Sequence, residues 1–137
     1  MGKQTEETAR YRAGVAVRRS VLGDAHVDRA EKATTDFDRP FQQMITEGAW
    51  GTVWSRPGFT RRERSIVTLS LLAGLGHQEE LVLHLKATEN TGASREDILE
   101  AFLHVAIYAG VPAANAAVRI AKQTFAEIDA KAAADAG

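Results

Sequence analysis

The spacing of the apolar residues is the feature that most constrains what this chain can fold into. They recur mostly at three- and four-residue intervals, and only three of the 137 residues are proline. Such spacing is typical of amphipathic helices, whereas half-buried strands alternate apolar and polar residues. The pattern therefore predicts an all-α fold, a bundle of helices.

Capping residues and glycines divide this pattern into separate helices. Thr60 and Ser94 are each followed three residues later by an acidic residue, which predicts two capping boxes. Gly23 is expected to end the first helix, and His26 to lie in the turn after it. Residues 49–58, with two tryptophans and a proline, are expected to form a packed loop. The predicted helices span residues 6–22, 39–48, 61–75, 77–90, 95–109 and 112–128.

Length and charge limit the organisation of the chain and its partners. A chain of 137 residues can enclose one core, so we expect a single domain over residues 1–137, frayed at 1–5 and 131–137. The 17 basic and 18 acidic residues give a net charge of −1. Because this charge is close to zero, we expect no nucleic-acid or membrane partner. The expected partners are small molecules and further copies of the chain.

Cysteine is absent, which excludes disulfides, thiolate nucleophiles and thiol redox cycles. The sequence also has no glycine-rich phosphate loop, nucleophile elbow or dinucleotide-binding motif, so nucleotide chemistry is disfavoured. The first residues are polar and no apolar run is long enough to span a membrane, so the cytoplasm is the expected location.

One predicted helix, residues 77–90, carries polar groups that could perform chemistry. Its leucines and valine point nearly all round, which is typical of a buried helix, yet His77, Glu80, His84 and Thr88 share one stripe. We therefore expect this stripe to face the interior. A carboxylate and an imidazole one turn apart can hydrogen-bond, and burial would tune both for proton transfer.

Two other interpretations of this stripe remain open. A Glu–His pair at this spacing is more often a solvated or structural contact than a catalytic one. His77, Glu80 and His84 could also bind zinc through three ligands on one face. The zinc interpretation is disfavoured because no fourth ligand or familiar metalloenzyme spacing is present.

Two further groups of side chains are candidates for binding a ligand. His104 and Tyr108 are one helical turn apart and could line a pocket or satisfy hydrogen bonds in the core. Four arginines cluster between residues 56 and 64, and one of them pointing inward could hold a substrate carboxylate through two hydrogen bonds.

Four segments of the chain resemble the γ-carboxymuconolactone decarboxylases of aromatic-acid degradation. In chain order they are YRAGVAVRRSVLGDAHVD, AWGTVWSRPG, ELVLH and YAGVPAAN. The wider superfamily includes alkylhydroperoxidase D-like proteins, which place a Cys-x-x-Cys pair where this chain has His77 and Glu80. Peroxidase chemistry is therefore excluded. The resemblance implies the all-helical alkylhydroperoxidase D-like fold, a homohexamer built from dimers or trimers, and no cofactor.

The resemblance also implies an activity and roles for individual residues. The activity is the loss of carbon dioxide from 4-carboxymuconolactone, which gives the enol-lactone of 3-oxoadipate. The resemblance implies that His84 donates the proton and that Glu80 orients the His84 imidazole. Arg64 is expected to bind a carboxylate or stabilise the dienolate. Trp54 is expected at subunit contacts as well as at the pocket. The side chains expected to bind substrate are His77, His104, Tyr108 and Trp54.

Two rival interpretations remain. The chain could be a paralogue with the same proton-transfer site that acts on a different lactone or 3-oxo acid. It could also be a non-catalytic oligomer or ligand-binding protein in which Glu80 and His84 are structural.

Overall fold

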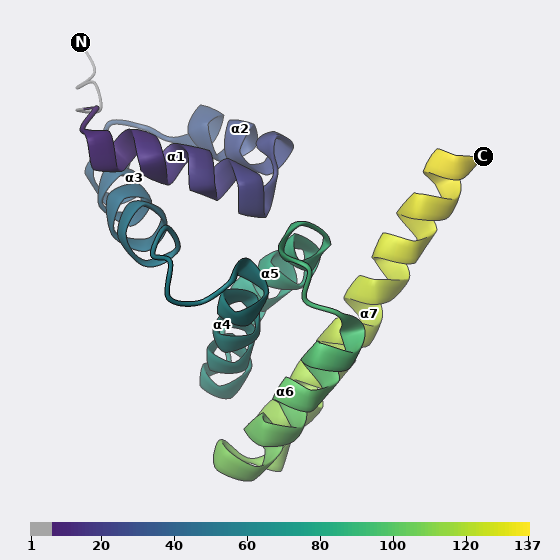
Figure 1. The fold of residues 1–137 in the computed structure, drawn as a ribbon. Coiled ribbons are helices and arrows are strands. Elements are labelled where there is room, and N and C mark those ends of the chain that lie inside the picture. The colour runs from purple at the N-terminus through teal and green to yellow at the C-terminus, as the bar shows by residue number, and fades with distance from the viewer. Residues whose placement is uncertain (1–6) are drawn as a thin grey trace. The chain divides into compact units, whose positions relative to one another are not determined.

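In a computed structural model of the protein, which describes residues 7–137, every regular element of that range is a helix (Figure 1). The all-α prediction is therefore confirmed. Residue contacts divide the chain into two compact units, Met1–Thr60 and Arg61–Gly137. The expectation of a single domain over residues 1–137 stays a prediction. No helix in the described range is long and apolar enough to cross a lipid bilayer.

The helices alternate with short turns in both units. The first unit contains α1 (Ala9–Leu22), α2 (Asp24–Ala33), α3 (Arg39–Ile45) and the π-helix η1 (Thr46–Val53). The second unit contains α4 (Arg61–Leu75), α5 (Gln78–Thr91), α6 (Arg95–Tyr108) and α7 (Val111–Ala136). The predicted start of the first helix, at residue 6, lies outside the described residues.

Two expectations for the first unit are wrong. Gly23 ends α1 with a positive φ of 89°, as predicted, but α2 begins at the very next residue and contains His26. The carboxylate of Asp24 lies in the first turn of α2, where it stabilises the positive end of the helix dipole. Residues 49–53, expected in a loop, belong to η1, whose small residues allow close packing against another helix.

Two glycines allow α1 and η1 to touch through their backbones. A Cβ atom at Gly14 would collide with the carbonyl oxygen of Thr46, and one at Gly51 with the carbonyl oxygen of Arg10. The η1 helix also buries Trp50, whose ring centroid lies 5.1 Å from that of Trp54. Glycine at these two positions is therefore required by the close approach of the helices.

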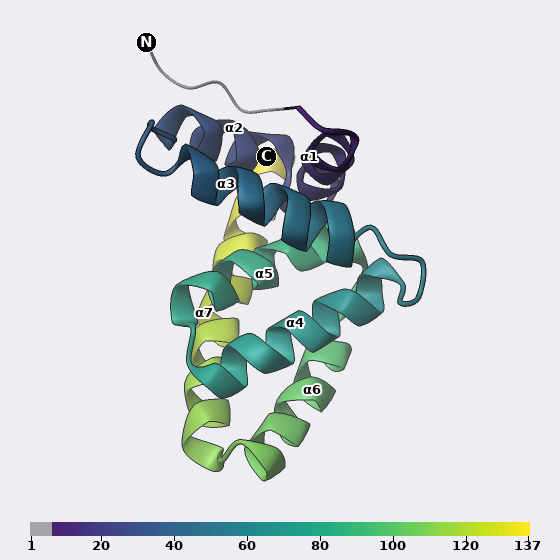
Figure 2. The same ribbon diagram turned by 90° about the vertical axis from the view of Figure 1, so that its left-hand side faces the viewer.

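The second unit consists of two helical hairpins (Figure 2). Gly76 and Gly110, both with positive φ, lie in the turns that join α4 to α5 and α6 to α7. The predicted capping box at Ser94 is confirmed, since its hydroxyl accepts from the Asp97 amide at 3.0 Å and Asp97 accepts from the Ser94 amide at 2.9 Å. The last helix, α7, continues to Ala136, beyond the end predicted at residue 128.

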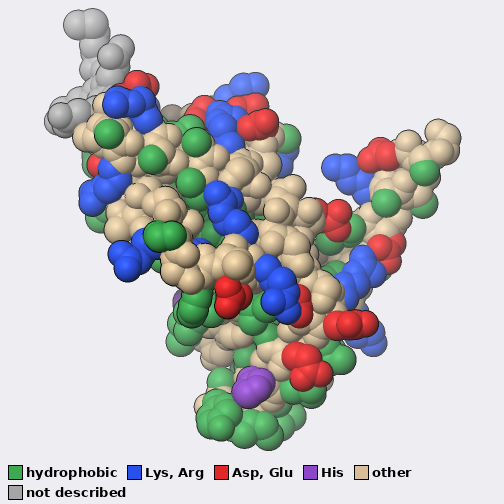
Figure 3. Space-filling view, viewed as in Figure 1, with side chains coloured by type: hydrophobic (Ala, Val, Ile, Leu, Met, Phe, Trp, Pro, Cys, Tyr) green, Lys and Arg blue, Asp and Glu red, His purple; other side chains and the backbone are tan. Residues whose placement is uncertain are grey.

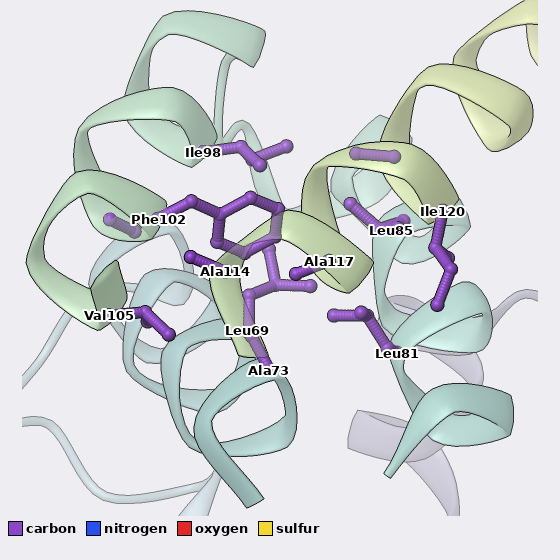
Figure 4. Close-up of a cluster of buried hydrophobic side chains, with 12 residues drawn as sticks. Leu69, Ala73, Leu81, Leu85, Ile98, Phe102, Val105, Ala114, Ala117 and Ile120 are labelled. Carbon is purple, nitrogen blue, oxygen red and sulfur yellow. The ribbon is translucent and has the colours of Figure 1, made fainter. Parts of the chain in front are cut away.

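The apolar core of this unit fixes how its four helices are rotated (Figure 4). Leu69 of α4 and Leu85 of α5 are fully buried, and Leu81 and Phe102 are 2% and 3% exposed. Burial of each such side chain stabilises the fold by about 1.5–3 kcal/mol. Because the rotation of each helix is fixed, the direction in which the neighbouring polar side chains point is fixed as well.

The contact between α1 and η1 predicts opposite effects for two glycine substitutions. Gly51→Ala should lower the free energy of unfolding by about 1–3 kcal/mol, because its methyl group meets backbone that cannot move aside. Gly48→Ala is the matched control, since nothing lies within 4 Å of its added Cβ and alanine favours a helix. Urea unfolding measures both. Equal stability of the two variants would contradict the close packing.

Candidate active site

The candidate site is built on α5, the helix that also contributes Leu81 and Leu85 to the core. Glu80 and His84 each immediately precede one of these leucines. Because successive helical residues are about 100° apart, the Glu80–His84 stripe borders the buried face. His77 precedes the helix as its N-cap residue, although its side chain makes no capping hydrogen bond.

The expected burial of this stripe is only partly observed. His84 is half-buried and its Nδ1 atom has less than 1 Å² exposed, so the imidazole is directed toward the protein. Thr88 is also half-buried, and its hydroxyl donates to the Leu85 carbonyl at 2.7 Å. Glu80 and His77, however, are exposed, so the prediction that they face the interior is wrong for the single chain. Glu80 lies in the first turn of α5 and His77 directly before the helix, next to the turn that joins α4 to α5.

One arginine of the predicted cluster points inward. Arg64 is half-buried, and less than 1 Å² of its Nε atom is exposed. It lies on α4, which packs against α5, and the next residue, Ser65, is completely buried. The neighbouring Arg62 is instead exposed and bound to Asp97, with Nε–Oδ2 and Nη2–Oδ1 distances of 2.8 and 2.6 Å. Arg62 thus has a structural partner, and it holds the pKa of Asp97 well below the usual range of a carboxyl group.

His104 and Tyr108 lie on α6, and their rings stack with centroids 6.2 Å apart and planes 11° apart. Both side chains are exposed. They line a groove of about 340 Å³ between α4 and α6, together with Ser70, Leu71, Gly74, Leu75, Val105 and Ala109. This lining contains no arginine or lysine.

The remaining predicted residue, Trp54, belongs to the first unit, where it is buried beside Trp50. No three histidine, aspartate or glutamate side chains among residues 7–137 are grouped in a way that could hold a metal ion.

Sequence reasoning missed two polar groups that the structure singles out. Ser65 is fully buried, and its hydroxyl has no hydrogen-bond partner among the described residues. Its spacing of four and eight residues from Leu69 and Ala73 is the signal that places it on the buried face of α4. Arg18 of α1 is the second, with a buried Nε atom that also lacks a partner there. The sequence pattern assigned Arg18 only to an amphipathic helix.

Comparison with known proteins identifies relatives that are named for two different decarboxylase activities. The chain is 44% identical over 119 residues to a 4-carboxymuconolactone decarboxylase of Acinetobacter baylyi, covering 87% of this chain and 89% of that protein. It is also 44% identical over 112 residues to the nitrosuccinic acid decarboxylase npaB of Metarhizium robertsii, covering 82% and 78%. A 4-carboxymuconolactone decarboxylase of Pseudomonas putida matches at 56% identity over 46 residues, 34% of this chain and 96% of that protein. Residues 39–123 match the sequence model of the carboxymuconolactone decarboxylase family. The chain therefore belongs to the carboxymuconolactone decarboxylase family.

Proposed function

We propose that this protein is a carboxy-lyase that converts 4-carboxymuconolactone to the enol-lactone of 3-oxoadipate with release of carbon dioxide. The observation that carries the proposal is the 44% identity, over 87% of the chain, to a relative named for this activity. The half-buried imidazole of His84 and the inward Arg64 on the packed pair α5 and α4 support it.

The chemistry needs little beyond these groups. The carboxylate that leaves is attached to a ring carbon joined through a double bond to the lactone carbonyl, so the electrons left behind delocalise as a dienolate. The substrate thus serves as its own electron sink, and we propose that no cofactor takes part. The protein must hold the carboxylates, stabilise the dienolate oxygen and supply one proton to the ring.

Each task has a candidate residue. His84 donates the proton, because its imidazole is the half-buried acid on α5. Glu80, one turn earlier on the same stripe, orients the imidazole. Arg64 binds a carboxylate or stabilises the dienolate through its planar guanidinium. His77, His104, Tyr108 and Trp54 remain proposed contacts of the substrate.

A second candidate substrate is nitrosuccinic acid, because the relative named for it is also 44% identical to this chain. It too carries two carboxyl groups, and its nitro group can accept the electrons that decarboxylation leaves behind. The same proton donor and carboxylate-binding arginine would serve both reactions.

We propose that the chain forms a homohexamer and that it acts in the cytoplasm. The apolar face of the second unit supports self-association. On α4, Val67, Leu71 and Leu75 form an exposed stripe at four-residue spacing, of which Val67 is the least exposed at 43%. On α6, a matching stripe is formed by Leu99, Leu103 and Ile107. Hydrophobic side chains gather at the end of α6 in the space-filling view (Figure 3). Apolar surface of this extent is typical of a protein–protein interface.

The proposed activity predicts carbon dioxide release from 4-carboxymuconolactone generated in place by a cycloisomerase. Glu80→Gln should lower kcat, by at most the ~10²–10⁴-fold that a positioned general acid contributes. Glu79→Gln is the matched control, since it is an exposed carboxylate on the adjacent face of α5. A folded wild type that releases carbon dioxide only from nitrosuccinic acid would favour the second candidate. Release from neither would contradict both.

The proposed interface predicts a change of mass in solution. Wild type should exceed the 14.8 kDa of one chain in light scattering, and Leu103→Glu should reduce the mass by placing a charge in the apolar face. Lys122→Glu, an exposed charge reversal on α7, should leave the mass unchanged. A wild type at 14.8 kDa would disprove self-association.

A further inference from the structure

Two neighbouring arginines on α1 have very different surroundings. Arg19 is surrounded by carboxylates of α2, with N–O distances of 3.1 Å to Asp24, 2.9 Å to Asp28 and 3.3 Å to Glu31. These ion pairs join α1 to α2 across the turn at Gly23. Arg19 therefore has a structural role that accounts for its charge.

Arg18 has no such role. Its side chain is half-buried and less than 1 Å² of its Nε atom is exposed, yet Nε has no hydrogen-bond partner within residues 7–137. No carboxylate of that range lies within 4.0 Å of it in an ion pair. Burying a guanidinium without an acceptor costs free energy, and here burial lowers the pKa of Arg18. A buried donor of this kind calls for an acceptor that the unit itself does not supply.

The groups that influence Arg18 could complete a site for an anion. His26 of α2 is half-buried, and its pKa is lowered first by burial and then by the charges of Arg18 and Arg29. It is therefore neutral at neutral pH and offers one N–H donor. Tyr11 lies seven residues, about two helical turns, before Arg18 and is half-buried on the same face of α1. Glu31 also interacts with Arg18, but its carboxylate is bound to Arg19.

We propose that Arg18 forms a binding site for the carboxylate of a small organic acid, with His26 of α2 and Tyr11 of α1 as its polar neighbours. The Nε and Nη groups of a guanidinium match the two oxygens of a carboxylate, which makes a bidentate pair the arrangement that satisfies the buried Nε. The choice of a small organic acid rests on the proposed function, whose substrates carry two carboxylates. A carboxylate of a second copy of the chain has the same chemistry, and the experiment separates the two sources.

The test measures the binding of adipate, a stable aliphatic dicarboxylate, by isothermal titration calorimetry. Arg18→Gln should weaken binding at least about tenfold, the loss expected for removing one charge-assisted bidentate contact. Arg12→Gln is the matched control, since Arg12 is an exposed arginine on another face of α1 and its loss should leave adipate binding as in the wild type. Arg18→Lys keeps the positive charge but removes the paired N–H donors of the guanidinium, so it should also weaken adipate binding. This variant replaces Arg18→Gln in the test if Arg18→Gln does not fold.

The outcomes separate this site from the proposed activity. Equal adipate affinity in the wild type and both Arg18 variants would overturn the site, even in a wild type that releases carbon dioxide from the lactone. Binding that depends on Arg18 would support the site even in a wild type that is inactive. A wild type that does not bind adipate, with an Arg18→Gln variant of altered mass in light scattering, would assign Arg18 to a carboxylate of a second copy and overturn the small-molecule site.

Discussion

The burial of Leu81 and Leu85 in the core of the second unit is the constraint on which the candidate site depends. Because both leucines are held among the side chains of α4, α6 and α7, α5 cannot rotate about its axis. The residue before each leucine then lies at the edge of the buried face, and these residues are Glu80 and His84. On α4 the buried Ser65 and Leu69 fix Arg64 in the same way.

This arrangement suits a reaction in which the substrate supplies its own electron sink. A decarboxylase of this kind needs a few oriented groups, and a core of packed helices positions such groups more accurately than loops do. The exposed apolar stripes of α4 and α6 complement this arrangement, since covering them with another copy would remove costly surface from water.

Much of the fold could be predicted from local patterns. Three observed features depend only on residues that are close in the chain. They are the helices predicted from the spacing of apolar residues, the capping box at Ser94 and the end of α1 at Gly23. The π-helix and the contacts at Gly14 and Gly51 could not be predicted in this way, because they depend on how α1 packs against η1. For the same reason, the sequence indicated the Glu80–His84 stripe but not that Glu80 is exposed in the single chain.

The central claim, that the imidazole of His84 donates the proton, is tested most directly by chemical rescue of His84→Ala. Removing the imidazole should lower kcat for carbon dioxide release by ~10²–10⁴-fold, the contribution typical of a general acid. Free imidazole added to this variant should restore part of the lost turnover, with a rate that rises with its concentration. A folded His84→Ala variant that turns over as fast as the wild type would contradict the account.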